Sequence, residues 1–187
     1  MTNLVAKNNV TSIDNNNVDY SKKIALPGNQ IFGDLMPAQV SVHIFANRHP
    51  LCQNGNTMYV PDPKIFRVLL KYLFAPKRTL GFGLFGPTRV GKTDMIRFVA
   101  DKLNWPMKIV SCHNGIEPYQ LEGSRSLKDG EKGVVTDFDF NACATACREG
   151  HILLLDEVDK LNPDATAKLH LLLEGKPWPI DETGEVI

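Results

Sequence analysis

Eight consecutive residues carry the clearest chemical signal in this sequence. Their two glycines, separated by four other residues and followed by a lysine and a threonine, have the spacing of a loop that wraps a polyphosphate in backbone N–H groups. A helix that begins at Lys92 would point the positive end of its dipole at the phosphates. We expect Lys92 to reach the β- and γ-phosphates and the Thr93 hydroxyl to bind Mg²⁺. The loop consists of Gly86, Pro87, Thr88, Arg89, Val90, Gly91, Lys92 and Thr93.

The second signal is an acidic pair, Asp156-Glu157, directly after the apolar run 152–155. A carboxylate at the end of a buried strand can hold Mg²⁺ through its water shell, and we expect this of Asp156. Glu157 is placed to orient or deprotonate an attacking water. Acidic pairs also occur in solvated turns, but the phosphate-binding loop upstream favours the catalytic interpretation. The two motifs together predict binding of a nucleoside triphosphate, with ATP and Mg²⁺ as cofactors.

The segments around these motifs alternate between strands and helices. Short apolar runs predict buried strands at 79–85, 107–112 and 151–155. Amphipathic patterns and capping residues predict helices over 62–73, 92–103, 140–149 and 162–175. A glycine- and charge-rich stretch at 123–133 is expected to be a loop. This alternation predicts a mostly parallel sheet covered on both faces, the three-layer α/β/α core of a P-loop NTPase.

The first 60 residues differ from the rest in composition. Residues 1–30 are rich in asparagine and lack apolar periodicity, so we expect a disordered leader there. Alternating residues at 40–45, an Asn54-Gly55 turn and the short segment 57–60 predict a small β-hairpin within 31–60. The nucleotide-binding core is then expected to occupy 61–187.

Composition and charge narrow the class of protein. The 187 residues carry 21 basic and 21 acidic side chains, a formal charge of zero that argues against a protein built to coat nucleic acid. The sequence lacks a signal peptide and an apolar run long enough to span a membrane, so a cytoplasmic protein is expected.

The four cysteines fit a reducing compartment, because none forms a CxxC pair. Cys143 and Cys147, followed by His151, offer a formal metal-site spacing. The alternative is a buried helical stripe of Phe140, Cys143 and Cys147, ended by Gly150 before His151 can join it. We favour the buried stripe.

Together, these motifs resemble the AAA+ ATPases, and more narrowly their MoxR-like and CobS-like (cobaltochelatase-subunit-like) branch. Segments 150–160 and 169–175 resemble that branch most, with further likeness at 61–63 and 103–106, over a total span of 59–187. The resemblance implies an ATP-driven ring, often a hexamer, that remodels a partner protein or inserts a metal into one. It assigns ATP and Mg²⁺ to the loop 86–93, metal support to Asp156 and water activation to Glu157.

The resemblance also raises finer expectations. Ser111 or a neighbour on the second strand would gate Glu157. Segment 119–133 would be a substrate-facing pore loop or, equally, a solvated connector. Segment 178–187 resembles the start of a hairpin that precedes the next core strand.

The sequence departs from this family in its length. It ends before the polar sensor, the arginine finger and the helical lid that such ATPases carry, so we expect a truncated chain with slow turnover. Two alternatives stay open: an adaptor that binds nucleotide without hydrolysing it, and the GTP-using motor of a restriction system.

Overall fold

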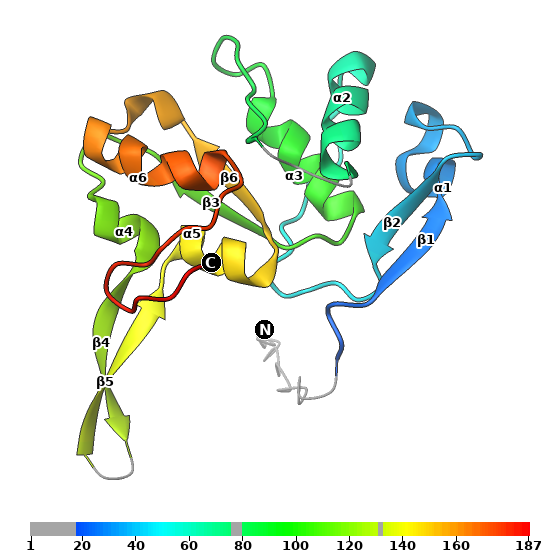
Figure 1. The fold of residues 1–187 in the computed structure, drawn as a ribbon. Helices are drawn as coiled ribbons and strands as arrows, with labels where there is room; N and C mark the ends of the chain where they lie inside the picture. Colours follow the sequence, from blue (N-terminus) through cyan, green and yellow to red (C-terminus); the bar gives the residue numbers. More distant parts are fainter. Residues whose placement is uncertain (1–17, 76–79, 131–132) are drawn as a thin grey trace, which may run out of the picture.

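Two parallel strands form the centre of the protein. The computed structural model describes residues 18–75, 80–130 and 133–187. Within it, β3 (Met107–Ser111) pairs with β6 (Ile152–Asp156) in a parallel register that begins at Met107 with Ile152 and ends at Ser111 with Asp156. Helices surround this pair in Figure 1. The predicted strands at 107–112 and 151–155 are therefore confirmed to within one residue at each end.

Alternate residues of these strands enter two different hydrophobic cores, because successive side chains of a strand point to opposite faces. Ile109, Ile152 and Leu154 pack with the first core, which is built on helices α2 (Pro63–Leu73) and α3 (Lys92–Lys102). Val110, Leu153 and Leu155 pack instead with the second core, which is built on α5 (Ala142–Glu149) and α6 (Pro163–Leu173). The sheet is thus covered on both faces, as the three-layer α/β/α prediction requires.

Capping residues that the sequence indicates lie at the ends of these helices. The Asp62 carboxylate accepts hydrogen bonds from the N–H groups of Lys64 and Ile65, at 2.8 and 3.0 Å, where α2 begins. Asn162 accepts one from Ala165 at 2.8 Å where α6 begins, and Gly150 ends α5 with φ of 68°. Each of these hydrogen bonds gives a partner to a backbone N–H of the first helical turn, which has none within the helix. In the described part of the chain, no helix is both long and apolar enough to cross a membrane.

A second, antiparallel pair lies beside the core, and it corrects two predictions about residues 1–60. β1 (Lys23–Pro27) pairs with β2 (Ser41–Phe45), and α1 (Gly28–Phe32) and the 3₁₀ turn η1 (Gly33–Leu35) connect them. Residues 23–30 are therefore ordered rather than part of a disordered leader, whose residues 1–17 lie outside the described ranges.

The hairpin predicted between 40–45 and 57–60 is also wrong, because β2 takes β1 as its partner. Val42 and Ile44 of β2 are buried, whereas Met58 and Val60 are 87% and 84% exposed. Residues 57 and 58 lie in a turn, and Tyr59 packs against the core built on α2 and α3 instead of along β2.

The buried strand predicted at 79–85 is absent from its described residues, 80–85. Leu80 is exposed and Phe85 is 95% exposed, while Phe82 and Leu84 lie against the first core. Residues 81–85 form neither a helix nor a strand, and Gly81 donates a backbone hydrogen bond of 2.7 Å to Leu173 at the end of α6. This apolar run therefore has one packed face but lies in no described sheet.

The loop predicted at 123–133 is instead a long antiparallel hairpin. β4 (Gly123–Gly130) follows the short helix α4 (Pro118–Glu122) and pairs along its whole length with β5 (Gly133–Phe140). Figure 1 shows this hairpin projecting away from the helical body. Phe140 consequently belongs to a strand, and the helical stripe predicted from it begins only at Ala142. Pairing between the two strands of the hairpin outweighed the polar composition.

Two short elements complete the chain. The 3₁₀ turn η2 (Val158–Lys160) follows β6. The final residues form a tight antiparallel turn, in which Trp178 and Ile187 exchange backbone hydrogen bonds of 2.8 and 2.9 Å. This antiparallel turn agrees with the hairpin start expected at 178–187, and the core strand expected after it stays a prediction.

Candidate phosphate-binding site

The glycine-rich loop leads directly into α3. Gly86 and Gly91 have φ angles of 152° and 82°, conformations that residues with a side chain rarely adopt. The first hydrogen bond of α3 runs from the Met95 N–H to the Gly91 carbonyl at 2.9 Å. The amides that precede Met95 therefore lack helical partners and can meet an anion.

Lys92 lies folded over this loop. Its Nζ donates hydrogen bonds to the carbonyl oxygens of Gly86 and Pro87, at 2.9 and 2.6 Å. The ammonium is thus held at the loop by two carbonyl oxygens, and phosphate oxygens would replace these as its acceptors. Thr88, Arg89 and Val90 form the exposed outer part of the loop, and Arg89 has a positive φ of 65°.

One contact joins the two predicted motifs. The Thr93 hydroxyl lies 3.2 Å from Oδ2 of Asp156, although the two residues are 63 positions apart. Thr93 is in the first turn of α3 and Asp156 is the last residue of β6. A hydroxyl and a carboxylate are hard oxygen ligands, so these two side chains fit Mg²⁺ that also binds phosphate oxygens. The predicted metal pair is therefore brought together.

Glu157 follows at the edge of the sheet. Its φ of 55° is left-handed, a strained conformation for a residue other than glycine that tends to occur at functional sites. Its carboxylate is half exposed and forms a 2.7 Å ion pair with Lys160. Ser111 is opposite Asp156 in the ladder, one residue from Glu157 in sequence register. The gating role expected of Ser111 stays a prediction.

Tyr59 is a residue of this region that the sequence analysis missed. A Cβ added to Gly91 would lie 2.8 Å from Cε2 of the Tyr59 ring, so the tyrosine packs directly on the glycine that opens α3. Burial, followed by the negative charges of Asp94 and Asp62, raises the pKa of the Tyr59 phenol. The local pattern at 57–60 favoured a strand, and no short-range signal indicates a contact with residue 91.

The cysteines occupy packing positions. Burial raises the pKa of the Cys143 thiol to about 12 and that of Cys147 to about 11, so both thiols stay protonated at neutral pH. Burial and Asp156 raise the pKa of Cys112 to about 11. Within the described ranges, no group of three or more histidines, cysteines or acidic residues is arranged to hold a metal ion.

A glycine loop that opens a helix, tied to a carboxylate at the carboxyl end of a parallel strand, is the arrangement of a P-loop nucleoside triphosphatase. Residues 81–187 match the family described as AAA domain (dynein-related subfamily), and the chain belongs to this family. The resemblance to AAA+ ATPases inferred from the sequence is thus confirmed, together with the α/β fold that it implies.

Several curated proteins are similar to about half of the chain. Protein NorQ of Paracoccus denitrificans is 41% identical over 105 residues, which are 56% of this chain and 37% of NorQ. Protein CbbQ of Hydrogenophilus thermoluteolus is 35% identical over 56% of this chain and 38% of its own length. Denitrification regulatory protein NirQ of Stutzerimonas stutzeri is 34% identical over 54% of this chain and 36% of its own length. The chain matches less than two-fifths of the length of each of these relatives.

Proposed function

We propose that this chain binds Mg²⁺ and ATP at the loop 86–93 and contributes the hydrolytic residues of an ATP-driven machine. The observation that carries the proposal is the 3.2 Å contact between Thr93 and Asp156, which joins the phosphate-binding loop to the acidic strand end. Membership of the AAA domain family supports the same activity.

Each side chain has a definite part in this proposal. Lys92 exchanges its two carbonyl acceptors for phosphate oxygens, and the amides at the start of α3 bind the same phosphates. Thr93 and Asp156 hold Mg²⁺, which neutralises charge on the phosphates when it is bound. Glu157 accepts the proton of the attacking water once its pairing with Lys160 is broken.

We further propose that the β4–β5 hairpin contacts a partner protein, and that ring assembly places such hairpins together. The hairpin projects beyond the helical body in Figure 1, and Leu127 on it is 75% exposed. Its base is anchored, because Arg125 pairs with Glu182 at 2.8 Å and Asn141 donates backbone and side-chain bonds to α4. An anchored base with an exposed apolar side chain suits transmission of force to a client. Remodelling of a partner, including the opening of a partner to a metal, is the activity we expect of the complete protein.

Isothermal titration calorimetry with ATP and Mg²⁺ tests the nucleotide site. Lys92→Ala should weaken ATP binding about 10- to 150-fold, because a hydrogen bond to a charged group contributes roughly 1.5–3 kcal/mol. Lys102→Ala, at the other end of the same helix, is the matched control and should bind as the wild type does. Equal affinities for Lys92→Ala and Lys102→Ala would refute the assignment of the loop.

Photo-crosslinking tests the hairpin. A benzoylphenylalanine at position 127 should crosslink to casein, used as a model client, more strongly when ATP is present. The same group at position 171, an exposed leucine on α6, is the control. Equal crosslinking from both positions, with or without ATP, would contradict the proposed client contact.

A further inference from the structure

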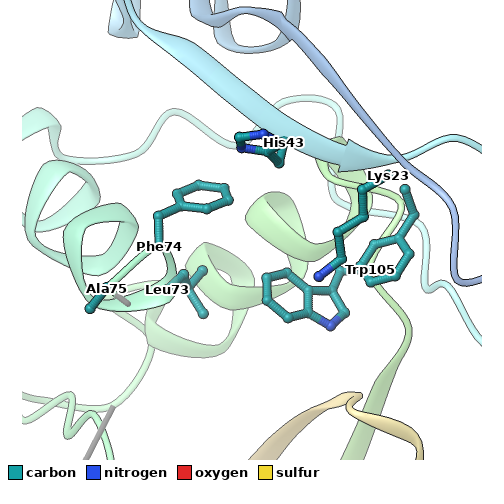
Figure 2. A pocket seen from close by; sticks show the side chains of 7 residues that line it. Lys23, His43, Leu73, Phe74, Ala75 and Trp105 are labelled. Atoms are coloured by element: carbon teal, nitrogen blue, oxygen red, sulfur yellow. The ribbon is translucent and has the colours of Figure 1, made fainter. Parts of the chain in front are cut away.

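A cavity lined by aromatic rings lies between the β1–β2 pair and the end of α2. It has a volume of about 220 Å³, and Figure 2 shows the rings of His43, Phe74 and Trp105 around it, with Leu73 on one side. Phe45 of β2 also lines it. A space of this size is smaller than the pocket of a drug-sized molecule, so it suits a small ligand with one ring.

Lys23 of β1 places its ammonium at this cavity. The Nζ lies 4.8 Å from the centroid of the Phe45 ring and 5.4 Å from that of Trp105, and Figure 2 shows it beside the indole. Ring faces attract a cation but leave its charge uncompensated. In the part of the chain that the structure describes, no acidic side chain pairs with Lys23. The ammonium is therefore able to accept an anionic partner.

A second, larger cleft of about 440 Å³ shares Lys23 and Phe45 with the first. His49, Glu149 and His151 line it, and the Glu149 carboxylate already pairs with Nε2 of His151 at 3.2 Å. The His151 side chain is only 5% exposed, and its Nδ1 has no hydrogen-bond partner among the described residues. Lys23 is thus at the junction of an aromatic cavity and a cleft with an unused polar nitrogen.

This junction is remote from the phosphate-binding loop. Pro106 and His151, which line the cleft, immediately precede the first residues of β3 and β6. The Thr93–Asp156 contact is at the last residue of β6, the opposite end of the sheet. A ligand bound at Lys23 would therefore not compete with nucleotide for space.

We propose that this junction binds a small aromatic monocarboxylate. The aromatic ring occupies the cavity between Phe45, Phe74 and Trp105, where offset or edge-to-face contacts between rings are favourable. The carboxylate pairs with Lys23, whose single positive charge matches a monoanion better than a doubly charged phosphate. Because the site is formed by β1, β2 and the core together, the bound ligand also holds the β1–β2 pair against α2.

The test is an NMR titration of the ¹⁵N-labelled chain with benzoate, an aromatic monocarboxylate with one ring, as the probe. The indole N–H signal of Trp105 should shift saturably, whereas that of Trp178, buried in the second core, should not. Lys23→Met should weaken binding about fivefold, the effect of one partly exposed ion pair. Lys22→Met, which removes a neighbouring charge that lines neither cavity, should leave the affinity unchanged.

A neutral analogue, benzyl alcohol, separates the charge from the ring. It should bind weakly and with equal affinity to the wild type and to Lys23→Met, and added salt should weaken only the binding of benzoate. Equal benzoate affinity for Lys23→Met and Lys22→Met would overturn the proposal. So would a salt-independent affinity of the wild type, a measurement that needs no variant to fold, or equal shifts of the Trp105 and Trp178 signals.

Discussion

Replacement of Lys168 by methionine should destabilise this protein strongly, because Lys168 bridges two carboxylates at the base of the β4–β5 hairpin. Its Nζ pairs with Oε1 of Glu122 and lies 2.7 Å from Oδ2 of Asp181. Oε2 of Glu122 also accepts a hydrogen bond of 3.0 Å from the Asp181 N–H. Burial alone would lower the pKa of Lys168, but the bonds to Asp181 and Glu122 outweigh burial and raise it.

The magnitude follows from which group is left without a partner. The Glu122 side chain is 3% exposed, so Lys168→Met leaves a buried carboxylate with no cation. Breaking a buried pair in this way costs about 3–5 kcal/mol, and because Lys168 itself is 16% exposed we expect the lower end, about 3 kcal/mol. For a chain of this length, that loss lowers the melting temperature by roughly 6–12 °C.

Thermal and urea unfolding followed by circular dichroism measure the loss. Lys176→Met is the matched control, because it removes a lysine whose 2.6 Å pair with Glu174 is exposed and should cost less than about 1 kcal/mol. Adding Glu122→Gln to Lys168→Met removes the stranded charge and keeps an acceptor for Asp181, so it should restore part of the lost stability. If Lys168→Met costs no more than Lys176→Met, the buried pair does not hold the hairpin base.

Three further predictions concern catalysis, pH and packing. In a form of the protein that hydrolyses ATP, Glu157→Gln should bind ATP normally but lower the turnover rate at least about 100-fold, since the amide cannot accept the proton. A phosphate-release assay measures this, and unchanged turnover would show that another residue activates the water. Burial lowers the pKa of His151, so the unfolded state binds more protons and the free energy of unfolding should fall as the pH drops below about 6.5. His151→Gln should flatten that dependence in urea titrations at several pH values. Gly123→Ala should destabilise the β4–β5 hairpin by about 1–3 kcal/mol in thermal unfolding, because the added Cβ would lie 2.5 Å from the Asp139 carbonyl oxygen; an unchanged melting temperature would contradict that packing.

The sequence by itself determined the parts of this protein that depend on short-range chemistry. The caps at Asp62 and Asn162 and the helix end at Gly150 each act within about four residues, and the phosphate-binding loop spans eight, all within the range of local backbone contacts. The acidic end of β6 was equally readable, because an apolar run followed by carboxylates is a local pattern.

Tertiary structure alone decided which distant segments meet. Composition made 123–133 resemble a loop, yet pairing with β5 makes it half of a hairpin, and β2 takes β1 rather than 57–60 as its partner. The contact of Tyr59 with Gly91 and the pairing of Lys168 with Glu122 likewise join segments far apart in the chain. Strand partners and buried ion pairs are selected by the complete packing of the core, because their free energy arises only when distant surfaces lose water together.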